Sequence, residues 1–232
     1  MLLLALWPHG SAEAKSDQRM LERSCEGASR YKFDFGDDAV VAPMARYFYD
    51  YKNGNAESPA QAACRPPFIE VRNLLEFSVH FRLDLLGLPN MDENKSKILV
   101  VVSRNRKNWT LEFLDSIESD EHDYIVSTES VSDSEGLGVI RKFRKSLGGY
   151  DVHYVFSNRQ SIADRPHEFV VRCVDLDTKS ISGRELGQRC MFMVSYGKSL
   201  TLRVLFFTAE VEVRDAYSLY RRLIDVFVRA AP

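Results

Sequence analysis

Serine and lysine residues form two patterns that resemble functional motifs, and both patterns are incomplete. Gly197-Lys198-Ser199 matches the end of a phosphate-binding loop, but Phe192 stands where that motif requires its first glycine. Ser195-x-x-Lys198 and Ser29-x-x-Lys32 have the spacing of an acyl-serine enzyme, but no Lys-Thr-Gly accompanies them. Neither Gly-x-Ser-x-Gly nor Gly-x-Gly-x-x-Gly occurs. These residues therefore predict neither a catalytic nucleophile nor a nucleotide site.

The histidines and carboxylates do not form a recognisable constellation either. No histidine pairs with another histidine or with a glutamate at the spacing of a metal-binding helix. His80 and His153 fall on polar positions of two expected strands, where they could be neighbours in space. The carboxylates are too numerous to single out a glycosidase-like pair. We therefore assign no catalytic residue, no cofactor and no metal from the sequence, and an enzyme is the less favoured interpretation.

One segment has an unusual charge distribution. Between Asn108 and Ile140 there is no lysine or arginine, whereas nine residues are acidic, and Arg141, Lys142, Arg144 and Lys145 follow directly. These charges are compatible with solvated loops that the flanking bases neutralise. They are also compatible with a docking surface for a cationic protein, because grouped carboxylates raise the encounter rate. The candidate partner-binding residues are Glu118, Asp120, Glu121 and Asp123.

The four cysteines predict disulfides. They are even in number and contain no Cys-x-x-Cys pair, which disfavours a zinc ribbon or a thioredoxin-type motif. Of the three pairings that four cysteines allow, we expect Cys25 with Cys64 and Cys173 with Cys190, because these join neighbours in sequence. The alternative is four buried thiols in a reducing compartment.

Apolar periodicity predicts mainly strands, with one helix near each end of the chain. The clearest strand runs from Phe77 to Leu85, where apolar and polar residues alternate. A short helix is expected from Asp37 to about Tyr51, and an amphipathic helix has its apolar stripe from Val213 to Val228. Tyr196-Gly197-Lys198-Ser199 is expected to be the turn of a hairpin over 190–207. Further strands are expected at Ile98–Ser103, Trp109–Leu114, Tyr124–Thr128, Tyr150–Phe156, Phe169–Val174, Cys190–Tyr196 and Leu200–Phe207.

These elements predict an α+β fold, in which an antiparallel sheet packs against the C-terminal amphipathic helix and a short N-terminal helix. No βα alternation for a Rossmann or barrel fold is present. We expect residues 15–30 to be a flexible N-terminal segment and residues 31–232 to form a single domain, with a subdivision near residue 95 as the alternative.

The N-terminus favours export. Met1 to Trp7 are apolar and Ala12-x-Ala14 resembles a signal-peptidase site, so residues 1–14 are a candidate signal peptide. No basic residue precedes the apolar run, a defect that a start codon assigned too far downstream would explain. The alternative is a hydrophobic N-terminus on a cytoplasmic protein. No later stretch reaches the length of about 18 apolar residues that a membrane span needs.

Composition excludes several classes of protein. With 232 residues, 45% of them hydrophobic, the chain can bury a sizeable core. Because 33 acidic residues stand against 31 basic ones, no net positive field attracts nucleic acid. We therefore expect a periplasmic or secreted, non-catalytic binding protein of the bacterial envelope, such as an immunity or inhibitor protein that neutralises a toxin by contact. The alternative is an exported hydrolase whose site is scattered along the sequence, and no oligomeric state is assigned.

Overall fold

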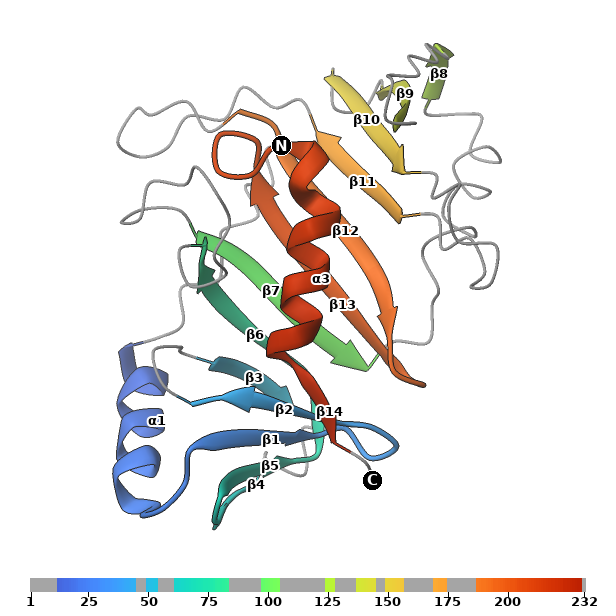
Figure 1. Ribbon diagram of the computed structural model, residues 1–232. Coiled ribbons are helices and arrows are strands. Elements are labelled where there is room, and N and C mark those ends of the chain that lie inside the picture. Colours follow the sequence, from blue (N-terminus) through green and yellow to red (C-terminus); the bar gives the residue numbers. More distant parts are fainter. Residues whose placement is uncertain are drawn as a thin grey trace. The chain divides into compact units, whose positions relative to one another are not determined.

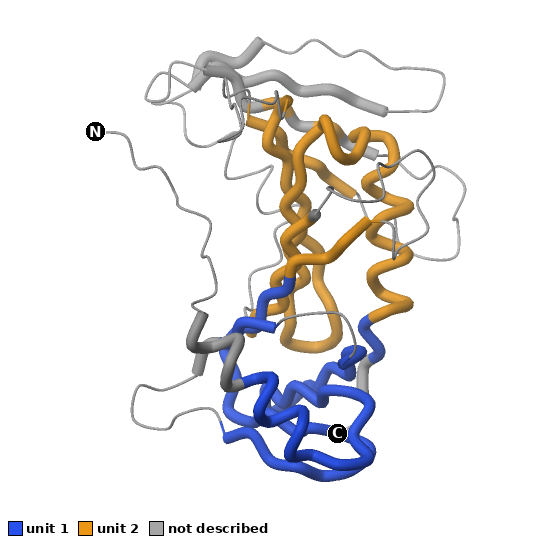
Figure 2. The backbone as a smooth tube through the Cα atoms, turned by 90° about the vertical axis from the view of Figure 1, so that its left-hand side faces the viewer, with its two compact units in different colours: residues 1–79, 227–232 blue, residues 80–226 orange. Residues whose placement is uncertain are grey.

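The computed structural model describes residues 12–44, 49–53, 61–83, 97–104, 124–127, 137–144, 149–156, 169–174 and 187–230, and Figure 1 shows their helices and strands. The chain divides into two units (Figure 2). Unit 1 consists of Met1–Val79 with Phe227–Pro232, and unit 2 consists of His80–Val226. The strand β6 (Leu74–Arg82) passes from unit 1 into unit 2.

Unit 1 contains helix α1 (Ala12–Ser24) and a five-stranded sheet in the order β14-β2-β1-β5-β4. Strands β1 and β5 are parallel, and the other neighbours are antiparallel. A separate strand, β3 (Tyr49–Asn53), pairs with the first part of β6. The strands of the sheet are β1 (Arg30–Asp34), β2 (Ala39–Pro43), β4 (Gln61–Arg65), β5 (Phe68–Arg72) and β14 (Val228–Ala230).

Aromatic side chains fill the core of unit 1. The ring centroids of Phe33 and Phe77 are 4.2 Å apart, and those of Phe77 and Phe227 are 5.8 Å apart. Tyr31 and Tyr49 complete the group and are almost fully buried. Because large rings carry much of the apolar area that folding buries, this cluster determines how β1, β3 and β6 pack.

Unit 2 is built on an antiparallel sheet in the order β7-β13-β12-β11-β10-β9-β8, with the end of β6 next to β7. Helix α3 (Ala216–Val226) follows a single 3-10 turn, Val213–Asp215, and packs on β11 and β12 (Figure 1). Its Tyr220 ring lies 5.8 Å from Phe169. The strands are β7 (Lys97–Arg104), β8 (Tyr124–Ser127), β9 (Leu137–Arg144), β10 (Gly149–Phe156), β11 (Phe169–Val174), β12 (Arg189–Tyr196) and β13 (Leu200–Phe207).

The expected α+β fold is confirmed, as is the hairpin over 190–207, in which Tyr196 pairs with Leu200. The strand expected from Phe77 to Leu85 is also present, as β6, but it begins earlier, at Leu74, and ends at Arg82. The other expected strands in the described residues also form, and Trp109–Leu114 lies outside them. In the part of the chain that the structure describes, no helix is long and apolar enough to cross a membrane. The domain boundaries expected from the sequence stay a prediction.

The helix expected from Asp37 to Tyr51 is wrong. The structure has β2 and β3 there, because β2 pairs with β1 and β3 pairs with β6. The β-branched Val40 and Val41, and Pro43, which cannot donate a helical hydrogen bond, are compatible with strands. Helix α1 was not expected, since residues 15–30 show no apolar period. Its described side chains explain this: the buried residue facing the fold is the polar Gln18.

The C-terminal helix is shorter than its apolar stripe suggests. It ends at Val226, after which Phe227 joins the aromatic core of unit 1. Val228 begins β14 and is 49% exposed, so the prediction that it belongs to the buried stripe of the helix is wrong. The pairing of β14 with β2 explains the difference, because the backbone changes from helix to strand within two residues.

Candidate functional site

The acidic residues expected to bind a partner, Glu118, Asp120, Glu121 and Asp123, lie outside the described residues. The strands β8 and β9 on their C-terminal side are described, and β9 carries Arg141, Lys142 and Arg144 of the flanking basic group. The proposed role of the acidic segment therefore stays a prediction.

Both predicted disulfides are confirmed. Cys25, directly after α1, is joined to Cys64 of β4, with Cα atoms 5.4 Å apart. Cys173 and Cys190 join β11 to β12, with Cα atoms 4.0 Å apart. Each bond closes within one unit, and no cysteine of the chain is left as a free thiol.

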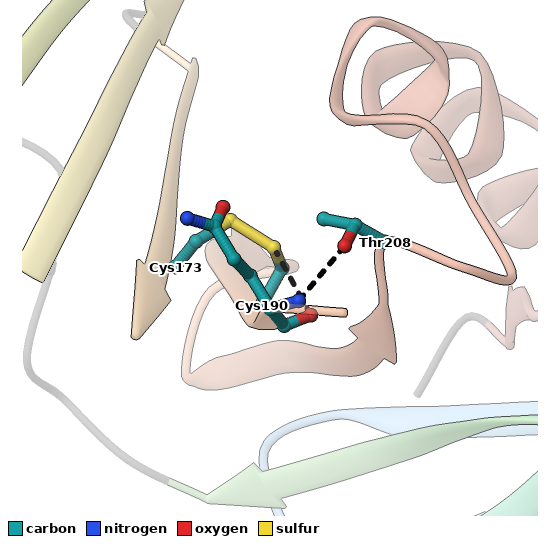
Figure 3. Close-up of a disulfide and its surroundings, with 4 residues drawn as sticks. Cys173, Cys190 and Thr208 are labelled. Atoms are coloured by element: carbon teal, nitrogen blue, oxygen red, sulfur yellow. Dashed lines mark hydrogen bonds between the residues drawn. A yellow bond between two sulfur atoms is a disulfide. The ribbon is translucent and has the colours of Figure 1, made fainter. Parts of the chain in front are cut away.

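The surroundings of the Cys173–Cys190 disulfide tie the start of β12 to the residue after β13 (Figure 3). The backbone N–H of Gln188 donates to Thr208 Oγ1 at 2.9 Å, and the N–H of Thr208 donates to the Gln188 carbonyl at 3.0 Å. Gly187 has a φ of +69°, and a Cβ atom at this position would overlap Thr208 Oγ1. Glycine is therefore the residue that fits here.

A buried polar network attaches α1 to the sheet strands of unit 1. The Gln18 side chain donates to Glu22 at 2.8 Å and accepts a hydrogen bond from the backbone N–H of Tyr49 at 3.1 Å. The Tyr31 hydroxyl also donates to Glu22, at 2.8 Å. Burial and the nearby Glu22 carboxylate raise the pKa of Tyr31 far above its usual range, so this hydroxyl stays protonated as a donor.

A second cluster is centred on the carboxylate of Glu70, and we call it the Glu70 cluster: Glu70, Lys32, Arg65 and Arg72. Arg72 donates to Glu70 Oε2 through Nη2 at 2.6 Å and Nε at 3.0 Å. Arg65 Nε lies 3.3 Å from the same oxygen, and Lys32 Nζ lies 3.4 Å from Oε1. Three cations thus converge on one carboxylate.

The electrostatic balance of this cluster keeps Glu70 ionised. Burial by itself raises the pKa of Glu70, but the hydrogen bonds and charges of Arg72 and Lys32 outweigh burial and hold the pKa below its usual range. The Glu70 side chain is only 7% exposed, whereas those of Arg65 and Arg72 are 64% and 43% exposed. The cluster therefore presents its cations to solvent and keeps its anion beneath them.

Sequence reasoning missed the Glu70 cluster, because Lys32 is distant in the chain from the other three members and because the strands β1, β4 and β5 that carry the cluster were not predicted. One signal was present: Phe68-Ile69-Glu70-Val71-Arg72 alternates between the two faces of a strand, with Ile69 and Val71 fully buried. The alternation indicates a strand with a charged outer face.

The motifs considered for enzymatic chemistry do not come together. His80 is on β6 and His153 on β10, and the strands β7, β13, β12 and β11 lie between them in the sheet order. Gly197 and Lys198 lie in the turn between β12 and β13, as expected for a hairpin. Within the described ranges, no three His, Cys, Asp or Glu side chains are placed to hold a metal ion.

Three comparisons with known proteins are negative: no protein-family model, no curated protein sequence and no solved structure matches the chain.

Proposed function

We propose that this chain is an exported, non-catalytic binding protein of the bacterial envelope that recognises a cationic protein. The observation that carries the export half is the pair of disulfides, one within each unit. Disulfides form and persist in the periplasm or outside the cell, and are rare in the cytoplasm. The predicted cleavage after Ala14 would remove the first three residues of α1 but would leave Gln18 and Glu22, which attach the helix, in the mature chain.

The binding half of the proposal is supported by the charge of the segment from Glu112 to Glu135, which contains nine acidic residues and no lysine or arginine. Such a segment attracts a positively charged surface over distances of about a Debye length, roughly 8 to 10 Å. A toxin with a basic active-site cleft has this chemistry, so the specific form we propose is an immunity or inhibitor protein that neutralises a toxin by contact.

Export is tested by the intact mass of protein extracted from the native envelope. The expected mass is that of a chain beginning near Lys15 with two disulfides. A chain that retains its N-terminus and has four free thiols would contradict export and place the protein in the cytoplasm.

Binding is tested with the protein captured from that envelope as the partner, by measuring association rate against ionic strength. Replacing Glu118, Asp120, Glu121 and Asp123 with Ser should slow association and flatten its salt dependence. The matched control replaces four acidic residues elsewhere, Glu26, Asp37, Glu212 and Asp225, all of them exposed. If both variants slow association equally, the effect comes from net charge and the acidic segment is not the docking surface.

A further inference from the structure

We propose that the Glu70 cluster is a docking site for carboxylate groups of an acidic protein segment, and that Glu70 positions its arginines. The residues of this site belong to unit 1, whereas the acidic segment belongs to the sequence of unit 2, and the two have opposite charge. It is independent of the function proposed above, and either can fail without the other.

The strand register brings the cluster together on one face of the unit 1 sheet. Lys32 of β1 and Ala63 of β4 both pair with Glu70 of β5, and Arg65 pairs with Phe68. Because alternate residues of a strand point to the same face, these positions share one face. The opposite face carries Tyr31 and Ile69, which are buried in the core. The cluster therefore lies on the face directed away from the aromatic core.

The three cations of the cluster have more hydrogen-bond donors than the Glu70 carboxylate can accept. Two guanidinium groups and one ammonium carry about thirteen N–H donors, whereas a carboxylate has only about four acceptor positions. Among the described residues, Glu70 is the only carboxylate within ion-pair distance of Lys32, Arg65 and Arg72. The cluster thus has a surplus of donors and of positive charge, which favours an anionic ligand.

Glu70 also lowers the entropic cost of binding such a ligand. It holds Arg72 through two nitrogens and Arg65 through Nε, so their remaining guanidinium nitrogens are already oriented. The Cys25–Cys64 disulfide fixes the strand next to Arg65. Side chains that are held before binding lose less rotamer freedom on binding.

An acidic protein segment fits this face better than a nucleic acid backbone does. Arg30 and Arg65 both pair with Phe68, a half-buried ring, so apolar and guanidinium groups alternate on the face. Arginine and aromatic residues are enriched in protein interfaces. Asp34 shares the face, and the chain carries a net charge of −2, which disfavours a nucleic acid backbone.

The test titrates the full chain with a hexaglutamate peptide at low ionic strength, followed by amide and arginine Nε–H chemical shifts. The expected shifts centre on β1, β4 and β5 and on the Nε–H groups of Arg65 and Arg72. The double variant Arg65→Gln/Arg72→Gln should weaken binding about tenfold. The matched control, Arg19→Gln/Arg23→Gln, removes the same charge from exposed positions of α1 in the same unit and should leave the affinity unchanged.

Glu70→Gln distinguishes positioning from simple attraction. It makes the cluster more positive, so attraction alone predicts tighter binding, whereas loss of the positioning carboxylate predicts weaker binding. We expect weaker binding, with a native amide spectrum as evidence of folding. Unchanged or tighter binding of the peptide would overturn the proposal that Glu70 positions the arginines.

Other anions show whether the chemistry has been assigned correctly. Inorganic phosphate and vesicles containing phosphatidylglycerol serve as the competing probes. Binding of either probe at Arg65 and Arg72 without binding of the peptide would overturn the proposal. Equal loss in the α1 control would also overturn it, because the peptide would then be responding to net charge.

Discussion

Cys173 and Cys190 lie directly opposite each other on neighbouring antiparallel strands, and both residues are fully buried. Cys190 is two residues from Phe192 and therefore shares its sheet face, the face on which Phe192 contacts Tyr220 of α3. The disulfide is thus part of the unit 2 core, on the side that α3 covers.

The first prediction concerns this disulfide. The variant Cys173→Ala/Cys190→Ala should lower the free energy of unfolding by about 3 kcal/mol, because it restores chain freedom to the loop between the cysteines in the unfolded state. Urea denaturation followed by circular dichroism measures the change. Hydrogen exchange should locate it in β11 and β12, whereas Cys25→Ala/Cys64→Ala should affect α1 and β4. Faster exchange in the same strands for both variants would contradict separate roles.

The second prediction concerns Gly187, which should tolerate alanine poorly. An alanine at a φ of +69° is strained by about 1 to 2 kcal/mol, which lowers the free energy of unfolding. The added Cβ would also displace Thr208 Oγ1 from its hydrogen bond with the N–H of Gln188. Gly197→Ala is the matched control, because its φ of +78° carries the backbone cost in an exposed turn. Gly187→Ala should therefore lower the urea midpoint more than Gly197→Ala does. In a Thr208→Ala background, Gly187→Ala should lower the midpoint by a smaller amount than in the wild type. Equal decreases in the two backgrounds would show that Thr208 plays no part.

The third prediction concerns α3 as a core element. Leu223→Ala should lower the free energy of unfolding by about 2 to 5 kcal/mol, because Leu223 is fully buried and alanine would leave a cavity. Arg221→Ala, on the exposed side of the same helix, should change it by less than about 0.5 kcal/mol. An unchanged urea midpoint for Leu223→Ala would mean that α3 can detach from the sheet without loss of folding.

The fourth prediction concerns the pH dependence of stability through Glu70. Since folding lowers the pKa of Glu70, its ionised form stabilises the folded state above the ordinary value of 4.5. This contribution should be lost as the pH falls from 4.5 through the lower pKa of the folded state. Urea midpoints at several pH values should fall less steeply in this range for Glu70→Gln than for the wild type. Parallel curves would contradict an ionised Glu70 in the folded protein.

The sequence by itself determined the fold class, the disulfide pairing and the hairpin over 190–207. These features depend on patterns along the chain: alternation along strands, the pairing of consecutive cysteines, and a turn whose Gly197 adopts a positive φ. The helix around Leu223 was also predictable, because its apolar side chains recur at helical spacing and cover the sheet.

Only the tertiary structure decided the conformation of Val40 and Val41, the position of Phe227 and the existence of the Glu70 cluster. Val40 and Val41 are compatible with a buried helix face by spacing alone, but pairing with β1 makes them a strand. Phe227 continues the stripe of α3 in sequence and nevertheless packs on Phe77. Lys32, Glu70 and Arg65 meet because β1 and β4 flank β5. Strand pairing joins residues distant in the chain, and no local pattern in the sequence records which strands will be neighbours.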